Sequence, residues 1–183
     1  GLERLRLALP MVGPVSDDLA ASLVRLIRMV VERGGTIVIP DQAALLSHSV
    51  FQHQLVDKKP IEPTLEYGQS AVPGFHIMET QTTHWVETLV GLGATGVEVI
   101  LASVTGHPVA GHPMIPVLQI STNDLPLPYH NDVDLILPHD SVGWTDQLLK
   151  LICQTASQTY TPKTIDQGNL DFQITRGLLG VSM

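Results

Sequence analysis

The feature that most constrains this sequence is a repeated alternation of short apolar runs and amphipathic segments. Leucine and valine recur at helical spacing after Ser16, after Thr82-Thr83 and after about Thr145. Six runs rich in β-branched residues and leucine predict strands, at Leu5–Leu9, Thr36–Ile39, Gly74–Glu79, Val97–Ala102, Pro116–Ser121 and Val133–Leu137. Strands that alternate with helices form a parallel sheet covered on both faces. We therefore expect a Rossmann-like three-layer α/β/α domain with a mainly parallel sheet of about six strands.

The length of 183 residues suits a single domain over 1–183 with a sizeable core. Because only 4% of the residues are aromatic, this core must be aliphatic. Residues 161–183 show no clear period, and we expect them to form a tail that docks on the domain, with Leu178, Leu179 and Val181 making the contact. The start at Gly1 rather than at a methionine suggests a domain cut from a longer protein or the remnant of a tag.

Charge and cysteine content exclude several classes of function. The net charge is −8 with a pI near 5.3, which argues against a nucleic-acid partner or an anionic membrane surface. The single Cys153 rules out an internal disulfide and suits a reducing compartment. We expect no signal peptide, and no apolar run approaches the roughly 18 residues of a membrane span. We therefore expect a cytoplasmic protein.

Polar residues of little bulk follow the fourth and fifth predicted strands. Thr105, Gly106 and His107 end the fourth, and Thr122 and Asn123 end the fifth. The carboxyl ends of parallel strands meet at one edge of the sheet, where open α/β sheets bind their ligands. The sequence therefore predicts a ligand site at this edge.

Asp41 follows the second predicted strand and would lie at the same edge. Two roles are open for it, a site residue or the N-cap of a helix predicted over Gln42–Val56. The first strand is followed by Pro10–Pro14 instead of a G-x-G-x-x-G run, and no phosphate-binding loop appears elsewhere. We therefore expect no nucleotide cofactor.

Histidine is the other chemical resource of the predicted edge. His107 and His112 share the loop after the fourth strand and could converge on a metal ion, but their spacing equally fits ordinary loop residues. His139 follows the sixth strand. Four other histidines are expected at surface or core positions: His48 and His53 exposed on the second helix, His76 in the core, and His84 at the surface of the third helix.

Several short stretches, in their order and spacing, resemble the C-terminal domain of the altronate/galactarate dehydratase family. The stretches are Gly34–Val38, Pro73–Thr80, Gly91–Ala94, Thr105-Gly106, Pro116–Asn123 and Asp132–Asp134, with Gly13–Asp17 towards the start. The resemblance implies elimination of water from a small anionic sugar acid, with a divalent metal, usually iron. Such chemistry needs a base, an acid for the leaving group, and positive charge to hold an enolate-like intermediate.

The resemblance also implies the site residues and the partners. It suggests a preceding domain or subunit that completes the site, or a second copy of this chain. Its catalytic residues would be His107 and Asp41. Its substrate-binding residues would be Thr80, Thr105, Gly106, Gln119, Thr122 and Asn123.

The sequence departs from the family at the positions that handle an anion. His107 stands where the family has arginine, Gln119 where it has lysine, and Asp41 where it has glutamate. The family's longer loop after the first strand is also missing. None of the ten Lys and Arg residues falls at a predicted carboxyl edge, where burying a dicarboxylate without a cation costs roughly several kcal/mol.

Two functions therefore stay open. The chain is either the C-terminal domain of a sugar-acid dehydratase or a non-catalytic structural or ligand-binding domain that kept the fold and lost the anion-handling residues. In both cases we expect the isolated domain to fold without dehydrating a sugar acid.

Overall fold

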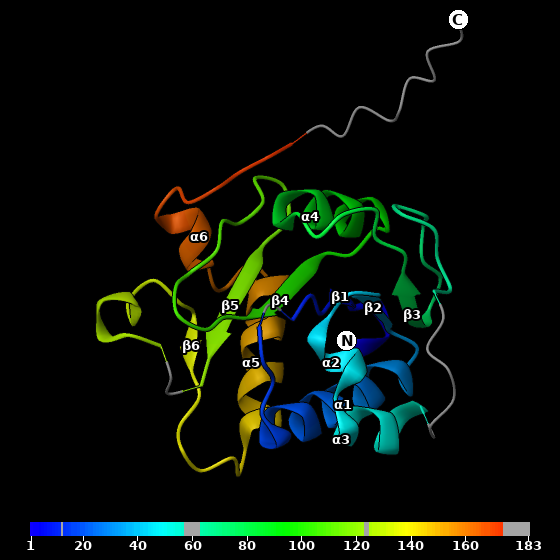
Figure 1. The fold of residues 1–183 in the computed structure, drawn as a ribbon, viewed down its shortest axis with the longest axis horizontal. Coiled ribbons are helices and arrows are strands. Elements are labelled where there is room, and N and C mark those ends of the chain that lie inside the picture. Colours follow the sequence, from blue (N-terminus) through cyan, green and yellow to red (C-terminus); the bar gives the residue numbers. More distant parts are fainter. Residues whose placement is uncertain (12, 57–62, 123–124, 174–183) are drawn as a thin grey trace, which may run out of the picture.

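A single parallel sheet of six strands lies at the centre of the computed structural model, which describes residues 1–11, 13–56, 63–122 and 125–173. The strand order is β3-β2-β1-β4-β5-β6, so the predicted fold class is confirmed (Figure 1). The strands are β1 (Arg6–Ala8), β2 (Thr36–Pro40), β3 (Gly74–Met78), β4 (Val99–Ser103), β5 (Val117–Ser121) and β6 (Leu135–Ile136). Each predicted strand is present, and β6 is shorter than its apolar run.

Helices cover both faces of this sheet, with α1, α3 and α5 on one face and α4 and α6 on the other (Figure 1). The helices are α1 (Asp17–Val31), α2 (Ala44–Ser47), α3 (Ser49–Phe51), α4 (Trp85–Ala94), α5 (Trp144–Ala156) and α6 (Lys163–Asp166). Shorter helical turns are η1 (Leu2–Arg4), η2 (Gln52–Val56) and η3 (Leu127–Tyr129). None of the helices within the described ranges is both long and apolar enough to cross a membrane.

The core divides into two layers because successive side chains of a strand point to opposite faces. Leu7 and Ile37 belong to the apolar cluster beneath α1 and α5, whereas Ala8 and Val38 belong to the cluster beneath α4. All four side chains are fully buried. Each buried Leu or Ile contributes on the order of 1.5–3 kcal/mol to folding, so the aliphatic runs alone define both layers.

The connection between β4 and β5 contains no helix in the structure, and we call residues 104–116 the β4–β5 loop. Three different elements hold three consecutive residues of its backbone. The Gln119 amide of β5 accepts from Val109 N (2.7 Å) and donates to Val109 O (3.0 Å). Trp85 Nε1 of α4 donates to Ala110 O (2.7 Å). The segment after α6 pairs with Gly111 through Gly111 N to Asn169 O (2.8 Å) and Asp171 N to Gly111 O (3.0 Å).

The predicted tail, residues 161–183, contains α6 as well as this segment after it. Gly111 also lies against α6, because a Cβ atom there would lie 2.6 Å from Thr164 Cβ. Leu178, Leu179 and Val181, the residues expected to dock, lie outside the described ranges.

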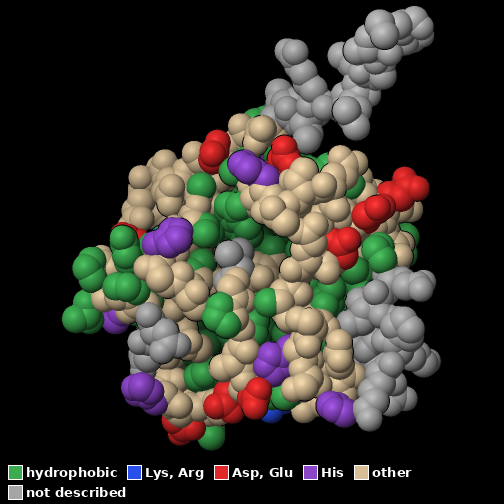
Figure 2. Space-filling view, viewed as in Figure 1, with side chains coloured by type: hydrophobic (Ala, Val, Ile, Leu, Met, Phe, Trp, Pro, Cys, Tyr) green, Lys and Arg blue, Asp and Glu red, His purple; other side chains and the backbone are tan. Residues whose placement is uncertain are grey.

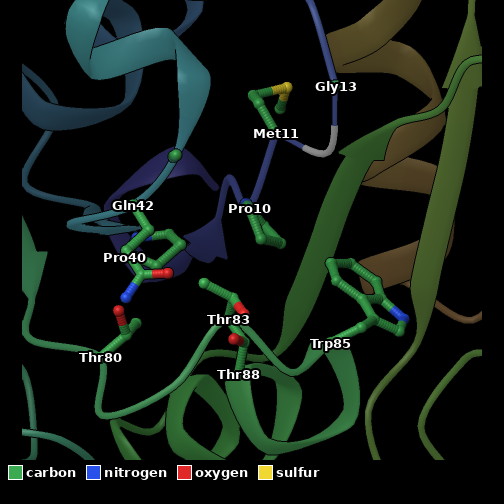
Figure 3. Close-up of a pocket in the computed structure, with 10 residues that line it drawn as sticks. Pro10, Met11, Gly13, Pro40, Gln42, Thr80, Thr83, Trp85 and Thr88 are labelled. Carbon is green, nitrogen blue, oxygen red and sulfur yellow. The ribbon is translucent and has the colours of Figure 1, made fainter.

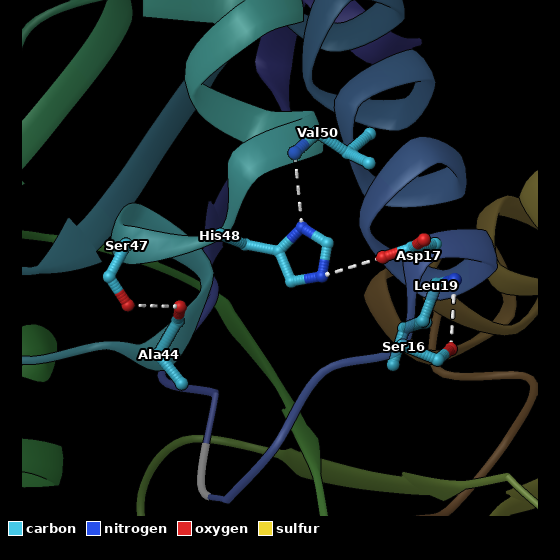
Figure 4. A network of polar contacts seen from close by, with 7 residues as sticks. All are labelled: Ser16, Asp17, Leu19, Ala44, Ser47, His48 and Val50. Atoms are coloured by element: carbon cyan, nitrogen blue, oxygen red, sulfur yellow. Dashed lines mark hydrogen bonds and ion pairs between the residues drawn. The ribbon is translucent and has the colours of Figure 1, made fainter.

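The prediction of one helix over Gln42–Val56 is wrong. The chain leaves helical geometry at His48 (φ −73°, ψ 131°), between α2 and α3. The prediction of His48 as an exposed helix residue is also wrong, because its Nδ1 accepts from Val50 N (3.2 Å) and caps α3 (Figure 4). Its Nε2 lies 3.3 Å from Asp17 Oδ1, so His48 joins the starts of α1 and α3.

Other predicted helix starts are closer to the structure. Ser16 caps α1 as predicted, with its Oγ accepting from Leu19 N (3.2 Å). The helix predicted from Thr82-Thr83 begins at Trp85 instead, but Thr82 Oγ1 accepts from His84 N (3.1 Å) and donates to the Glu87 carboxylate. Thr82 therefore holds the segment that leads into α4, although Thr82 itself lies before the helix.

Asp134, just before β6, is a half-buried carboxylate that joins three segments. Its Oδ2 accepts from Gln119 N of β5 (2.6 Å). Its Oδ1 accepts from Tyr160 OH (2.8 Å) and from Lys163 N (2.8 Å), which ties the chain after α5 to the sheet. Burial raises the pKa of Asp134, and burial together with the Asp134 carboxylate raises the pKa of Tyr160, which keeps the phenol a donor.

Candidate functional site

A pocket of about 260 Å³ opens at the carboxyl ends of β1, β2 and β3, beside the start of α4 (Figure 3). The strand order reverses between β1 and β4, where open α/β sheets bind ligands, and the pocket lies on the β1 side of this point. The pocket is lined by Pro10, Met11, Gly13, Pro40, Gln42, Ala43, Thr80, Thr83, Trp85 and Thr88.

Amide and hydroxyl groups supply the polar chemistry of this pocket. They come from Gln42 after β2, Thr80 and Thr83 after β3, and Thr88 on α4, and the side chains of Gln42 and Thr80 lie close together in Figure 3. None of the lining residues is charged. Proline, methionine and indole surfaces form the rest of the wall. Such a lining suits a small ligand that carries hydroxyl groups on an apolar skeleton.

Asp41 adjoins this pocket and is fixed by Thr80. Its Oδ1 accepts from Thr80 N (3.2 Å) and from the Thr80 hydroxyl, while Ala43 occupies the N-cap position of α2. Asp41 is therefore not the N-cap of a helix, which was one of the two roles that the sequence left open. The second carboxylate oxygen makes no hydrogen bond to any other residue in the described ranges and is available to a ligand.

The pair forms because β2 and β3 are neighbours. Pro40 lies opposite Met78 in their parallel register, so the residues just beyond each strand meet. The sequence correctly placed both Asp41 and Thr80 at strand ends, but their contact depends on which strands are adjacent.

Thr105 lies beside the same edge of the sheet. A Cβ atom on Gly13 would lie 2.9 Å from Thr105 Oγ1, so the segments that follow β1 and β4 meet here. Gly13 has φ +90°, which together with this close approach favours glycine. Gly106 (φ +78°) is exposed with open space around it, and Thr122 is half-buried. Asn123 lies outside the described residues.

His107 is exposed and lines another cavity, towards η3 and the segment after α6. Asp41 adjoins the pocket at the ends of β1, β2 and β3, whereas His107 lines the other cavity, so the two predicted catalytic residues lie at different cavities. Their catalytic roles stay a prediction. Gln119 is fully buried, and both ends of its amide bind Val109. Because both polar atoms of this side chain hydrogen-bond to the β4–β5 loop, we do not include Gln119 in the proposed site.

The histidines of the β4–β5 loop have separate environments. His112 is buried, its Nδ1 accepts from Met114 N (3.1 Å), and its ring meets Phe172 edge-on at 5.4 Å. Burial lowers the pKa of His112 and favours the neutral ring. His76, expected in the core, is half-buried on β3, with Nε2 2.9 Å from Val72 O.

The donor set of the described residues does not fit the divalent iron that the family resemblance implies. A metal ion of this kind takes several His, Cys, Asp or Glu ligands. No group of three or more such side chains comes together within the ranges that the structure describes.

Positive charge is also scarce near the pocket, and the face shown in Figure 2 displays almost no Lys or Arg. Arg25 of α1 reaches a separate groove beside Ser141 and Gly143, which follow β6. Its guanidinium donates to Thr145 Oγ1 and Ser22 Oγ (3.2 Å each). Sequence position alone did not reveal this placement, because α1 begins far from β6 along the chain.

The pocket contains residues that the sequence analysis did not select, namely Gln42, Thr83, Trp85 and Thr88. Their place in the sequence could have indicated them, because they lie in the segments that follow β2 and β3 or on the helix α4 that comes next. The sequence analysis instead placed the site after β4 and β5, at the same edge of the sheet, because polar residues of little bulk follow these two strands.

The sequence was also compared with known proteins. No model of a protein family matches the chain. A search of curated proteins found no match either.

Proposed function

We propose that this chain is the C-terminal domain of a cytoplasmic sugar-acid dehydratase of the altronate/galactarate type, and that it binds the hydroxyl-bearing part of the substrate. The observation that carries the proposal is the uncharged, hydroxyl-rich pocket, next to which the Asp41 carboxylate is held by the lining residue Thr80. The order of family-like sequence stretches supports the reaction class.

The pocket lining matches the carbon chain of an aldonate or aldarate. Threonine hydroxyls and the Gln42 amide both donate and accept, as sugar hydroxyls do, while Met11 and Trp85 offer apolar surface to the C–H groups. The volume of about 260 Å³ lies just below the range of about 300–1,000 Å³ typical of drug-sized ligands, which suits a smaller molecule.

Asp41 is the residue that we assign as base. Elimination begins with removal of a proton from the carbon next to the carboxylate, and a positioned carboxylate can accept it. Thr80 holds one oxygen of Asp41 and leaves the other for the substrate. The negative charge that then develops needs cations, which we assign to a preceding domain, another subunit or a second copy of the chain.

The alternative function is that of a non-catalytic structural or ligand-binding domain. The uncharged lining of the pocket and the engagement of Gln119 with the loop favour this alternative. Binding without turnover would distinguish it from the enzyme.

The test uses the full-length protein that contains this chain, a panel of hexarates and hexonates, and ferrous iron, with the keto-acid product as readout. We expect turnover that falls by about 10²–10⁴-fold in Asp41→Asn, the range for loss of a general base. Asp18→Asn, at the exposed start of α1, is the matched control and should retain activity.

The isolated chain provides the second arm. We expect it to bind these acids no more tightly than about millimolar and to form no product. Binding by the full-length protein without product would support a ligand-binding domain. Neither binding nor product would contradict the dehydratase and favour a structural domain. Turnover by the isolated chain would contradict the need for a partner.

A further inference from the structure

A second cavity, of about 360 Å³, lies between the β4–β5 loop, η3 and the segment after α6. It is lined by His107, Pro108, Tyr129, Asp132, Gln167 and Asn169. It shares no lining residue with the pocket at the ends of β1, β2 and β3.

The two amides of this cavity are fixed with their donors engaged. Gln167 Nε2 donates to Asp132 Oδ1 (3.0 Å) and to Asn131 O (3.3 Å). Asn169 Nδ2 donates to Val109 O (3.2 Å). A carbonyl or carboxylate can receive only a donor, so these bonds determine which end of each amide is used. Gln167 Oε1 and Asn169 Oδ1 are therefore the ends left to accept a hydrogen bond from a ligand.

Asp132 adds a negative charge to these acceptors. The residue is half-buried, and its carboxylate receives a hydrogen bond only from the neutral Gln167 among the described residues. No Lys or Arg lies within ion-pair distance of it in the described part of the chain. A partly buried carboxylate without a cation is stabilised when a ligand brings one.

Tyr129 completes the cavity with an aromatic ring that is 37% exposed. Aromatic rings attract cations through their electron-rich faces. The chain as a whole carries a net charge of −8, which attracts cations over a longer range.

We propose that this cavity binds an organic cation, a primary ammonium or guanidinium group. Acceptor oxygens from Asp132, Gln167 and Asn169 take its N–H donors, and the face of the Tyr129 ring contacts the charged group. The cation belongs either to a free small amine or to a Lys or Arg side chain of a protein partner. The proposal is independent of the proposed dehydratase function.

The test is an NMR titration of the ¹⁵N-labelled chain with n-butylammonium and with methylguanidinium, and with n-butanol as the uncharged control. We expect the side-chain amide signals of Gln167 and Asn169 to shift saturably with at least one of the two cations and not with n-butanol. Asp132→Asn should weaken that binding by at least about tenfold, as loss of a charge-assisted contact does. Asp166→Asn, an exposed carboxylate of α6 outside the cavity lining, is the matched control and should leave it unchanged.

A second variant covers the case in which Asp132→Asn disturbs the fold. Tyr129→Leu removes the ring and should weaken binding, whereas Leu127→Ala in the same turn should not. No saturable shift with either cation, or equal shifts in wild type and both Asp132→Asn and Tyr129→Leu, would overturn the proposal. Tighter binding of Gly-Lys-Gly or Gly-Arg-Gly peptides than of the free cations assigns the site to a protein side chain. The reverse order assigns it to a small amine.

Discussion

Asp134 shows how much of this fold depends on one carboxylate. It accepts hydrogen bonds from Gln119 N, Tyr160 OH and Lys163 N. Asparagine would turn an NH₂ donor towards one or more of these three donors and leave them unsatisfied. We expect Asp134→Asn to lower the free energy of unfolding by about 1–3 kcal/mol, measured by urea denaturation.

The pH dependence of stability supplies a second readout for Asp134. Burial raises the pKa of this carboxyl in the folded protein above its ordinary value of 3.8, so the folded state binds the proton more tightly than the unfolded state. The resulting stabilisation is fully present below pH 3.8 and is lost as the pH rises through the folded pKa. The stability deficit of Asp134→Asn relative to wild type should therefore grow as the pH falls from about 7 to about 4. A constant deficit over this range would contradict the assignment.

At the scale of elements, the β4–β5 loop connects two parallel strands without a helix, and contacts with other parts of the chain hold it in place. Trp85→Phe keeps an aromatic wall for the pocket but removes the donor to Ala110 O. We expect a stability loss of about 0.5–1.5 kcal/mol and faster amide hydrogen exchange at residues 109–111.

Trp144→Phe is the matched control for this variant. Its indole donates to Pro138 O (3.1 Å), near the start of α5 and away from the β4–β5 loop. The variant should lose similar stability without changing exchange in the loop. Equal acceleration in both variants would show that the Trp85 contact does not hold the loop specifically.

The helices and strands were predictable because the local sequence of each one favours that type of secondary structure. The buried runs at β2 and β5 contain β-branched residues between turn signals, and the structure places both strands within one residue of the prediction. The helix over Gln42–Val56 failed for a non-local reason. His48 contacts Asp17, which lies far earlier in the chain and is not visible in the local pattern, and the same imidazole caps α3 at Val50 N.

At the scale of the molecule, we expect residues 1–183 to unfold as one unit. Trp85 belongs to the layer with α4 and Trp144 to the layer with α5. Fluorescence of Trp144→Phe and of Trp85→Phe therefore reports each layer separately. Within each variant, the urea transition seen by its single tryptophan should coincide with that seen by far-ultraviolet circular dichroism. Two separate transitions would show two independent units.

The candidate site was only partly predictable at this scale. The rule that carboxyl ends of parallel strands share an edge correctly brought Asp41 and Thr80 to one place. The choice between neighbouring sides of that edge depends on strand order, and β1 lies at the centre of the sheet although it comes first in the sequence. The use of Gln119 to bind Val109 also depends on the path of an irregular loop, which residue preferences do not determine.

The backbone pairing of Gly111 with Asn169 and Asp171 has a consequence for the order of events during synthesis. On the ribosome the amino-terminal part of a chain emerges first, at about 5–20 residues per second. Strands β1 to β3 can pair with one another early, since all three lie within the first half of the sequence, whereas β1 must still pair with β4 and α1 must still pack against α5. The loop over β4 and β5 must wait for a segment made some sixty residues later, so a ribosome that stops before Asn169 leaves a nascent chain with this face uncovered.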